Sequence, residues 1–186
     1  MNYSLTLFAF AAALTSTVAG QTSSPPLEPS ASAQQLDYFA GDWNLEGEFK
    51  QSPFGPGGKC VEKEHFYWLS KDSFLVLHSD WTGPFGNGAT LGVLGIDPEK
   101  KFYTLDAFES NGTSEHWTQG TVQHNIWVWT GDERVGSMIL KARYTITTLT
   151  PTLYTVKYET SLDGQQWTTT MEGKATKIVK TAETGG

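Results

Sequence analysis

His78 and Asp80 lie two residues apart in a stretch that alternates between apolar and polar side chains. In an extended strand this spacing places both on one face. A histidine held by a carboxylate can act as a general base near neutral pH or help to bind a metal. Asp106, with either Glu115 or His116, follows on later strands that a barrel could bring near. We take His78, Asp80 and Asp106 as candidate catalytic residues, although their spacing matches no known catalytic signature, and we expect no metal site.

A second candidate site is aromatic, because 7 tryptophans and 7 tyrosines are many for a chain of 186 residues. Aromatic side chains line pockets for flat apolar molecules, and they are also common in strands and cores. The predicted ligand-binding residues are Trp43, Phe49, Tyr67, Trp81, Phe85, Phe108, Trp117, Trp129, Tyr144, Tyr158 and Trp167.

Other reactive residue types have ordinary interpretations. Cys60 is the only cysteine, so the chain has no internal disulfide, and we interpret it as a strand residue. Glu62 and Glu64 alternate with Lys63 and are expected on a charged outer face. The glycine-rich segment 82–88 follows no strand-to-helix pattern, so we predict a mobile flap at a barrel mouth, with Phe85 at its tip.

Strands must position all these side chains, because the body of the chain has almost no helical pattern. Apolar residues alternate with polar ones, and turn signals recur about every 8–12 residues, as in sandwiches and barrels. Asn-Gly at 111–112 and Asp-Gly at 163–164 are hairpin turns. The predicted strands are 42–52, 59–70, 73–81, 89–97, 102–110, 113–123, 126–132, 137–149, 153–161 and 166–178. A meander of about ten strands must split or close, and closure removes exposed edges.

Strand periodicity also assigns faces. Trp43, Leu45, Gly47 and Phe49 share one face of the first strand and are expected to point inward. Strand 73–81 is ambiguous, because both of its faces are partly apolar.

The ends of the chain differ from its body. Residues 5–14 form an apolar run too short to span a bilayer, and small residues that suit signal-peptidase cleavage follow it. We predict a signal peptide at 1–20, a disordered Pro/Ser-rich leader at 21–35, a barrel at 36–178 and a disordered tail at 179–186. A short helix is expected near 32–40. The mature protein would be secreted or periplasmic.

The formal charge of −7 restricts the classes of partner that the protein is expected to bind. An acidic domain lacks the basic surface that binding to nucleic acid or to an anionic membrane requires. A neutral, cationic or aromatic small molecule is the easier partner.

Gly41-x-Trp43, at the entry to the first strand and after a short helix, resembles the calycin superfamily, which includes lipocalins. This resemblance implies that Trp43 closes one end of a barrel below a ligand cavity. The region of about 36–176 also resembles a widespread bacterial calycin-like family of unknown function. The residues that fit its outline are Leu36, Phe39, Gly41, Trp43, Gly95, Asp97, Pro98, Phe102, Ser110, Gly112 and Gly120.

Haem-binding nitrobindin-like barrels begin with a similar motif, and they ligate iron through a histidine late in the chain. The last histidine here is His124, in a predicted turn, so we expect no haem and no other cofactor.

The sequence therefore predicts an all-β, closed, antiparallel calycin-like barrel that is a monomer or a weak homodimer. The favoured function is binding of a small apolar or aromatic molecule in an aromatic-lined cavity. One alternative is an enzyme of the hydrolase, isomerase or cyclase type that uses the histidine and carboxylates. Another is a structural barrel whose interior is fully packed.

Overall fold

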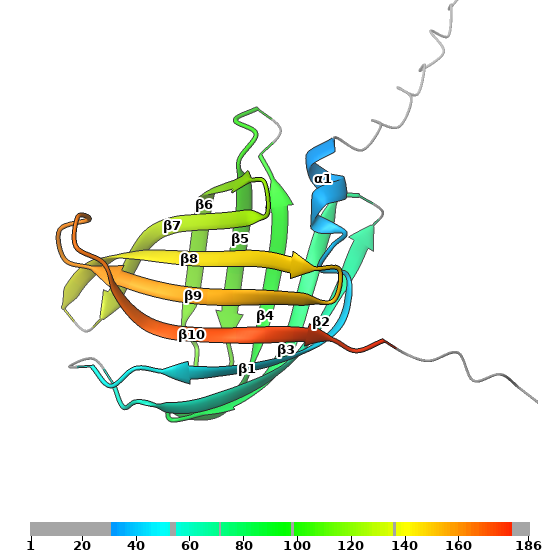
Figure 1. Cartoon of the computed structure of the whole chain (residues 1–186). Helices are drawn as coiled ribbons and strands as arrows, with labels where there is room; N and C mark the ends of the chain where they lie inside the picture. Colours follow the sequence, from blue (N-terminus) through cyan, green and yellow to red (C-terminus); the bar gives the residue numbers. More distant parts are fainter. Residues whose placement is uncertain (1–30, 53–54, 71, 98, 136, 180–186) are drawn as a thin grey trace, which may run out of the picture.

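Alternating side chains and short turns produce a chain made almost entirely of strands (Figure 1). The computed structural model describes residues 31–52, 55–70, 72–97, 99–135 and 137–179. Within them lies one helix, α1 (Ala31–Leu36). The ten strands are β1 (Gly41–Phe49), β2 (Gly58–Ser70), β3 (Phe74–Gly83), β4 (Gly86–Ile96), β5 (Tyr103–Glu109), β6 (Ser114–Gln123), β7 (Ile126–Val135), β8 (Met138–Thr150), β9 (Leu153–Ser161) and β10 (Thr168–Lys177). Each predicted strand is present, with ends that differ by a few residues.

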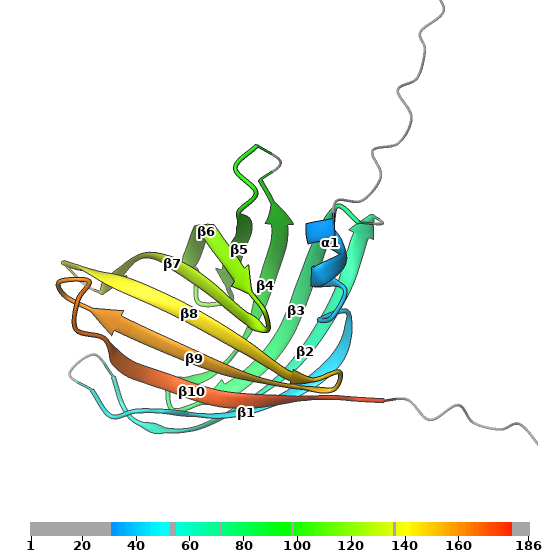
Figure 2. The ribbon, with the colours of Figure 1, turned by 45° about the horizontal axis from the view of Figure 1, so that its top comes forward.

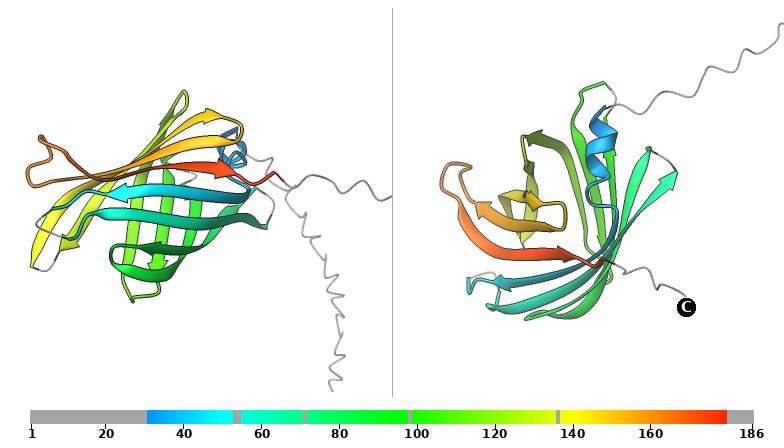
Figure 3. Two further views of the ribbon diagram at one scale, coloured as in Figure 1. Left: turned by 60° about the horizontal axis from the view of Figure 1, so that its bottom comes forward. Right: turned by 45° about the vertical axis from the view of Figure 1, so that its right-hand side comes forward.

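The strands pair in chain order, and the first strand pairs with the last. β1 and β10 are antiparallel, in a register that runs from Trp43 opposite Lys177 to Phe49 opposite Met171. Figure 3 shows the resulting ring of strands from two further directions. The prediction of a closed antiparallel barrel is therefore confirmed. Closure pairs the first and last strands, which would otherwise be the two edges of an open sheet.

The barrel wall is splayed between β6 and β7. Among the described residues, their ladder consists of three pairs, from Thr121 opposite Val128 to Gln123 opposite Ile126. The part of β6 before Thr121 pairs with β5 alone. Figures 1 and 2 show the consequence: β4–β6 run across the direction of β7–β10, and β6 and β7 separate away from their shared turn.

Two glycines lie where β6 and β7 separate, and each one is contacted by a tryptophan of the other strand. A Cβ on Gly131 of β7 would lie 3.1 Å from the Trp117 ring of β6, and a Cβ on Gly120 of β6 would lie 2.3 Å from Trp129 Nε1 of β7. The two indoles thus pack directly on backbone that has no side chain. This reciprocal packing of tryptophan on glycine holds β6 and β7 together where they have few backbone hydrogen bonds between them.

One end of the barrel is closed by α1 and the residues after it. Phe39 is 1% exposed and contacts the rings of Phe66, Trp127 and Tyr154. Trp43 is fully buried, and its Nε1 donates a hydrogen bond to the Phe39 carbonyl at 2.7 Å. This placement of Trp43 agrees with what the calycin resemblance implies.

Two expectations about connections need correction. The predicted flap at 82–88 is instead a tight hairpin, because β3 continues to Gly83, which pairs with Gly86 at the start of β4. Phe85 at its tip packs edge-on against Phe49, with 5.1 Å between ring centroids. The predicted leader 21–35 ends too late, because α1 already begins at Ala31.

The predicted signal peptide, residues 21–30 of the leader and residues 180–186 of the tail lie outside the described residues. Within the described part of the chain, no helix has the length and apolar character needed to cross a bilayer.

Candidate ligand-binding site in the barrel interior

Away from the closed end, polar side chains replace apolar ones on the inward face of the wall. On β2, Glu62 and Glu64 share a face with the buried residues Cys60 and Phe66. On β3, Ser79 shares a face with the fully buried Leu75. The inward-facing polar and aromatic residues of this half are Glu62, Glu64, Ser79, Trp81, Thr90, Glu109, Glu115, Trp117, Glu133, Tyr144 and Tyr158.

Hydrogen bonds hold two of these carboxylates beside tryptophan rings. Glu109 accepts hydrogen bonds from Trp81 Nε1 at 3.1 Å and from Thr90 Oγ1 at 2.9 Å. Glu115 accepts one from Trp117 Nε1 at 3.0 Å. Both indole edges therefore point at carboxylates, which fixes where these rings lie in the interior.

Glu64 lies deepest among these carboxylates and is 6% exposed. Burial raises the pKa of Glu64 from 4.5 to about 8, with the neighbouring charge of Glu62 adding to the rise. Tyr154 opposes the rise by donating a short hydrogen bond to Glu64 Oε2. Near neutral pH this carboxyl group therefore holds its proton for much of the time.

Two other inward glutamates also have raised pKa values. Burial is the main cause for Glu62, and the charge of Glu109 adds to it, while the nearby Ser79 hydroxyl opposes it. Burial also raises the pKa of Glu115, with contributions from Glu133 and Glu109, while the Trp117 hydrogen bond opposes it. These mutual effects show that the carboxylates interact electrostatically across one shared interior.

Several of these inward-facing side chains keep part of their surface accessible to solvent. Tyr144 is one of them, and its pKa is well above 10.0 because of burial and the charges of Glu64, Glu62 and Glu115. Glu62 and Tyr158 also face inward and are partly accessible. An inward-facing side chain with accessible surface borders space within the barrel, so this half of the barrel is not packed solid.

A separate open hollow of about 920 Å³ lies on the outer side of the wall. It is lined largely by outward-facing side chains of β1, β2 and β8–β10, such as Glu46, Lys157 and Glu172. Glu172 is paired there with Lys50 at 2.7 Å. Its mixed and paired charges offer no concentrated chemistry, and we place the candidate site inside the barrel.

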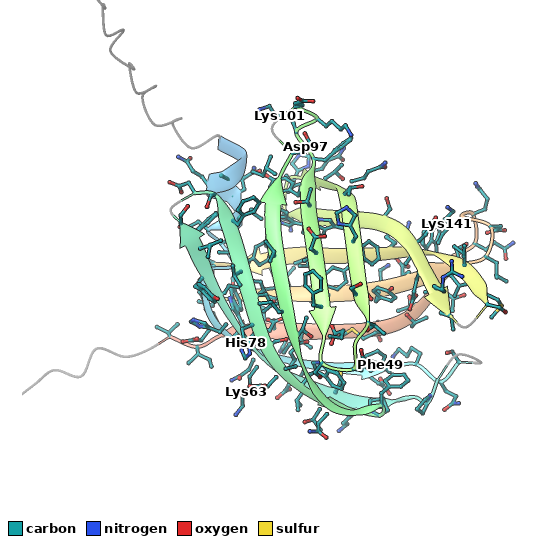
Figure 4. The ribbon with its side chains drawn as sticks, turned by 180° about the vertical axis from the view of Figure 1, so that it is seen from behind. Phe49, Lys63, His78, Asp97, Lys101 and Lys141 are labelled. Atoms are coloured by element: carbon teal, nitrogen blue, oxygen red, sulfur yellow. The ribbon has the colours of Figure 1, made fainter. Side chains whose placement is uncertain are left out.

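The structure brings seven of the predicted ligand-binding residues to the inward face, and they come from six strands. Trp43 belongs to the closed end, and Phe49 packs beside Phe85 near the opposite end (Figure 4). The inward residues are Trp43, Phe49, Trp81, Trp117, Trp129, Tyr144 and Tyr158.

Three predicted lining residues lie elsewhere. Tyr67 is 42% exposed and Phe108 is 51% exposed, both on the outer face. Trp167 lies before β10 and packs under the outward-facing guanidinium of Arg143, 4.2 Å from the ring centroid. Their prediction as cavity residues is wrong, because Tyr67 and Phe108 have the outward parity of their strands and Trp167 packs against an outward-facing side chain.

The predicted catalytic set is also wrong in its placement. His78 and Asp80 are exposed on the outer face of β3, because Leu75, Leu77 and Ser79 take the inward positions. Figure 4 shows His78 on this strand, near Lys63 of the neighbouring β2. No catalytic site can therefore be built on this pair inside the barrel.

Asp106 does meet one predicted partner, but on the outer surface. It forms a hydrogen bond with His116, whose side chain is 65% exposed. Glu115, the alternative partner, lies on the inward face. All four histidines are exposed, so the alternative of a histidine-dependent enzyme finds no histidine in the interior.

The inward glutamates of β2 are the residues that sequence reasoning missed. Glu62 and Glu64 were expected outside because they alternate with Lys63, and this prediction is wrong. The alternation along the strand indicated the inward face, because Glu62 and Glu64 lie an even number of residues from the apolar Cys60 and Phe66. Within the described residues, no three His, Cys, Asp or Glu side chains are grouped closely enough to hold a metal ion.

Comparisons with known proteins find the fold in solved structures. Rv2717c from M. tuberculosis matches with a TM-score of 0.58 and 14% identity, covering 82% of this chain and 100% of that one. The S-type phycobiliprotein lyase CPES from Guillardia theta matches with a TM-score of 0.52 and 11% identity, covering 84% and 100%. The fold that these structures share with the chain is a closed antiparallel β-barrel. No family model and no curated protein matches the sequence.

Proposed function

We propose that this barrel binds one small, largely aromatic or apolar molecule in its interior. The observation that carries the proposal is that inward-facing residues of the open half, above all Tyr144 and Tyr158, keep accessible surface and so border space within the barrel. A barrel that served only as a structural unit would gain stability by filling this space with side chains.

Aromatic rings supply the apolar wall of the proposed site. Tyr158 packs against Trp117 with centroids 6.1 Å apart and against Tyr144 at 6.4 Å, and Tyr144 packs against Trp129 at 6.3 Å. This row continues towards the closed end, where Trp129 stacks on Trp127 at 6.0 Å. A flat ligand would exchange water for these ring faces, at about 25 cal/mol per Å² of apolar surface buried.

Polar groups on the opposite side of the interior would orient the ligand. His78 and Asp106 were expected in this role, but both lie outside. Glu62, Ser79 and Glu109 take their place, on β2, β3 and β5. Binding sites of this kind combine mostly apolar walls with a few polar groups at defined positions.

A titration with 1-naphthalenemethanol, a neutral aromatic probe, tests the proposal. We expect saturable binding by calorimetry. Ala107 faces inward beside Glu109, so Ala107→Trp fills the interior and should abolish binding. Thr118→Trp adds the same ring on the exposed outer face of β6 and should leave binding intact. Binding that survives Ala107→Trp, or that is absent from the unmodified protein, would contradict an interior site.

We also propose that the protein is exported and that it belongs to the bacterial calycin-like family whose outline it resembles. The apolar run at 5–14 and the small residues after it support export. N-terminal sequencing of the protein purified from its own cells checks this part: a start near residue 20 or 21 is expected, and a retained Met1 would contradict it.

A further inference from the structure

Five glutamates of the described chain face the open half of the interior, and they come from four different strands. Glu62 and Glu64 lie on β2, Glu109 on β5, Glu115 on β6 and Glu133 on β7. We propose that the molecule bound inside the barrel is an organic cation, an ammonium or amidinium group carried on an aromatic or apolar body. This inference rests on the proposed function and names the chemical class of its ligand.

No basic side chain of the described residues neutralises these carboxylates from within. Lys177 points inward at the closed end, but its Nζ lies over the Trp43 ring and donates to the Tyr38 carbonyl. Arg143 faces outward and is paired with Glu159 at 2.8 Å. Although Glu64 holds its proton for much of the time near neutral pH, no positive side chain of the described residues balances the other interior carboxylates, and their charge attracts a positive guest and disfavours an anionic one.

An unpartnered hydroxyl supplies a second, independent sign of a ligand. Ser79 is 0% exposed and lies on β3 directly opposite Glu64 on one side and Thr90 on the other. Its Oγ is close enough to Glu62 to lower the pKa of that carboxyl, yet no hydrogen bond of normal geometry reaches it. A buried hydroxyl normally has a partner, and an N–H donor of a bound cation would supply one.

The Tyr158 hydroxyl on the far wall is also buried without a hydrogen bond of normal geometry. Glu133 lies near it, and burial and the charges of Glu115 and Glu133 raise the pKa of Tyr158 above its usual value. Two polar groups on opposite walls of the interior thus lack good partners, as expected of a site built around a molecule larger than a single water.

The tryptophans favour a cation as well. Trp81 and Trp117 direct their indole N–H groups at Glu109 and Glu115, so each ring lies beside a negative charge. A cation near such a pair is attracted both to the carboxylate and to the electron-rich face of the ring. A neutral aromatic ligand would gain only the ring.

The spacing of the carboxylates selects an organic cation over a metal ion. The described residues contain no group of three acidic, histidine or cysteine side chains that could coordinate one ion. Carboxylates spread over several strands fit a larger molecule whose charged group carries several N–H donors.

A matched set of naphthalene compounds tests the charge preference by calorimetry near neutral pH. The probes are 1-naphthylmethylamine, which is cationic, 1-naphthalenemethanol, which is neutral, and 1-naphthoate, which is anionic. We expect the amine to bind at least about tenfold more tightly than the alcohol, and 1-naphthoate not to bind, as charge-assisted contacts require.

Glu115→Gln and Glu62→Gln should each weaken binding of the amine about fivefold or more, and by a clearly larger factor than they weaken binding of the alcohol. Glu172→Gln removes the same charge from the outer face and should change neither. Thermal unfolding confirms that each variant folds, and if Glu62→Gln does not, Glu115→Gln and Glu133→Gln decide.

Equal binding of amine and alcohol would overturn the cation inference and leave the proposed interior site standing. Equal weakening of the amine by Glu172→Gln would also overturn it, because the outer surface charge would then be the cause. If neither compound binds, both the inference and the proposed function fail.

Discussion

The closed end and the open half of this barrel are built from the same strands but from opposite kinds of side chain. On β2, Phe66 is buried among aromatic rings at the closed end, whereas Glu64 and Glu62, two and four residues earlier, line the open half. At the closed end the indole of Trp43 has a hydrogen-bond partner. In the open half the hydroxyls of Ser79 and Tyr158 lack one.

This contrast separates stability from binding along the length of each strand. The closed end contains most of the large, fully buried side chains, so it supplies much of the favourable free energy of folding. The open half gathers inward-facing carboxylates that repel one another and oppose folding. Local conflicts of this kind are expected at functional sites, where the surrounding structure offsets their cost.

The largest expected effect comes from removing the tryptophan of the closed end. Trp43→Ala should lower the free energy of unfolding by about 3–5 kcal/mol, because it leaves a large cavity and removes a buried hydrogen bond. Trp81→Ala, at a partly exposed ring of the open half, should cost clearly less. Urea unfolding of both variants measures the difference, and equal losses would remove the distinction between the two ends.

The pH dependence of stability tests the contribution of a buried carboxyl group in the open half. The pKa of Glu64 is raised from 4.5 to about 8 in the folded state. Between these values the folded protein binds a proton that the unfolded chain does not, so this group makes stability fall as the pH rises. In the unmodified protein this group should lower the free energy of unfolding by roughly 2–4 kcal/mol between about pH 5 and pH 8, and Glu64→Gln should remove that loss.

Urea unfolding at both pH values measures the slope, and Glu172→Gln is the matched control. Lys50 lowers the pKa of Glu172, so the contribution of Glu172 is lost only as the pH falls below its ordinary value of 4.5. The control should keep the slope of the unmodified protein. An unchanged slope in Glu64→Gln would show that this carboxyl does not hold its proton in the folded state.

A smaller effect is expected at the junction of the two halves, where β6 and β7 separate. Gly120→Ala places a Cβ 2.3 Å from Trp129 Nε1 and 2.6 Å from the Tyr103 carbonyl oxygen, a contact that backbone cannot relieve cheaply. We expect a loss of about 1–3 kcal/mol. Gly131→Ala meets only the Trp117 ring, at 3.1 Å, and should cost less. Chemical denaturation ranks the two, and the reverse order would argue against a rigid contact at Gly120.

The smallest effect is expected on the outer face. His78→Ala should change the free energy of unfolding by no more than about 0.5 kcal/mol, because His78 is exposed on the outer face of β3. Binding of 1-naphthalenemethanol should also be unchanged in calorimetry. A loss of binding in this variant would show that the outer face of β3 takes part in ligand binding.

Local patterns in the sequence were enough to predict the ten strands, their meander order and the inward direction of Trp43, Leu45 and Phe49. The reason is that strand alternation and turn residues such as Asn111-Gly112 act over a few neighbouring positions. Closure followed from the number of strands, because an open meander of this length would expose two edges.

The acidic interior was decided by the tertiary structure. Charge alone places Glu62 and Glu64 outside, and on β3 both faces are apolar enough to point inward. Only the closed barrel determines that Ser79 faces inward with Glu64, that Glu109 lies near Glu62, and that His78 faces solvent. Such relations join strands far apart in the chain, and they depend on which face of each strand the closure turns inward, which local periodicity cannot specify.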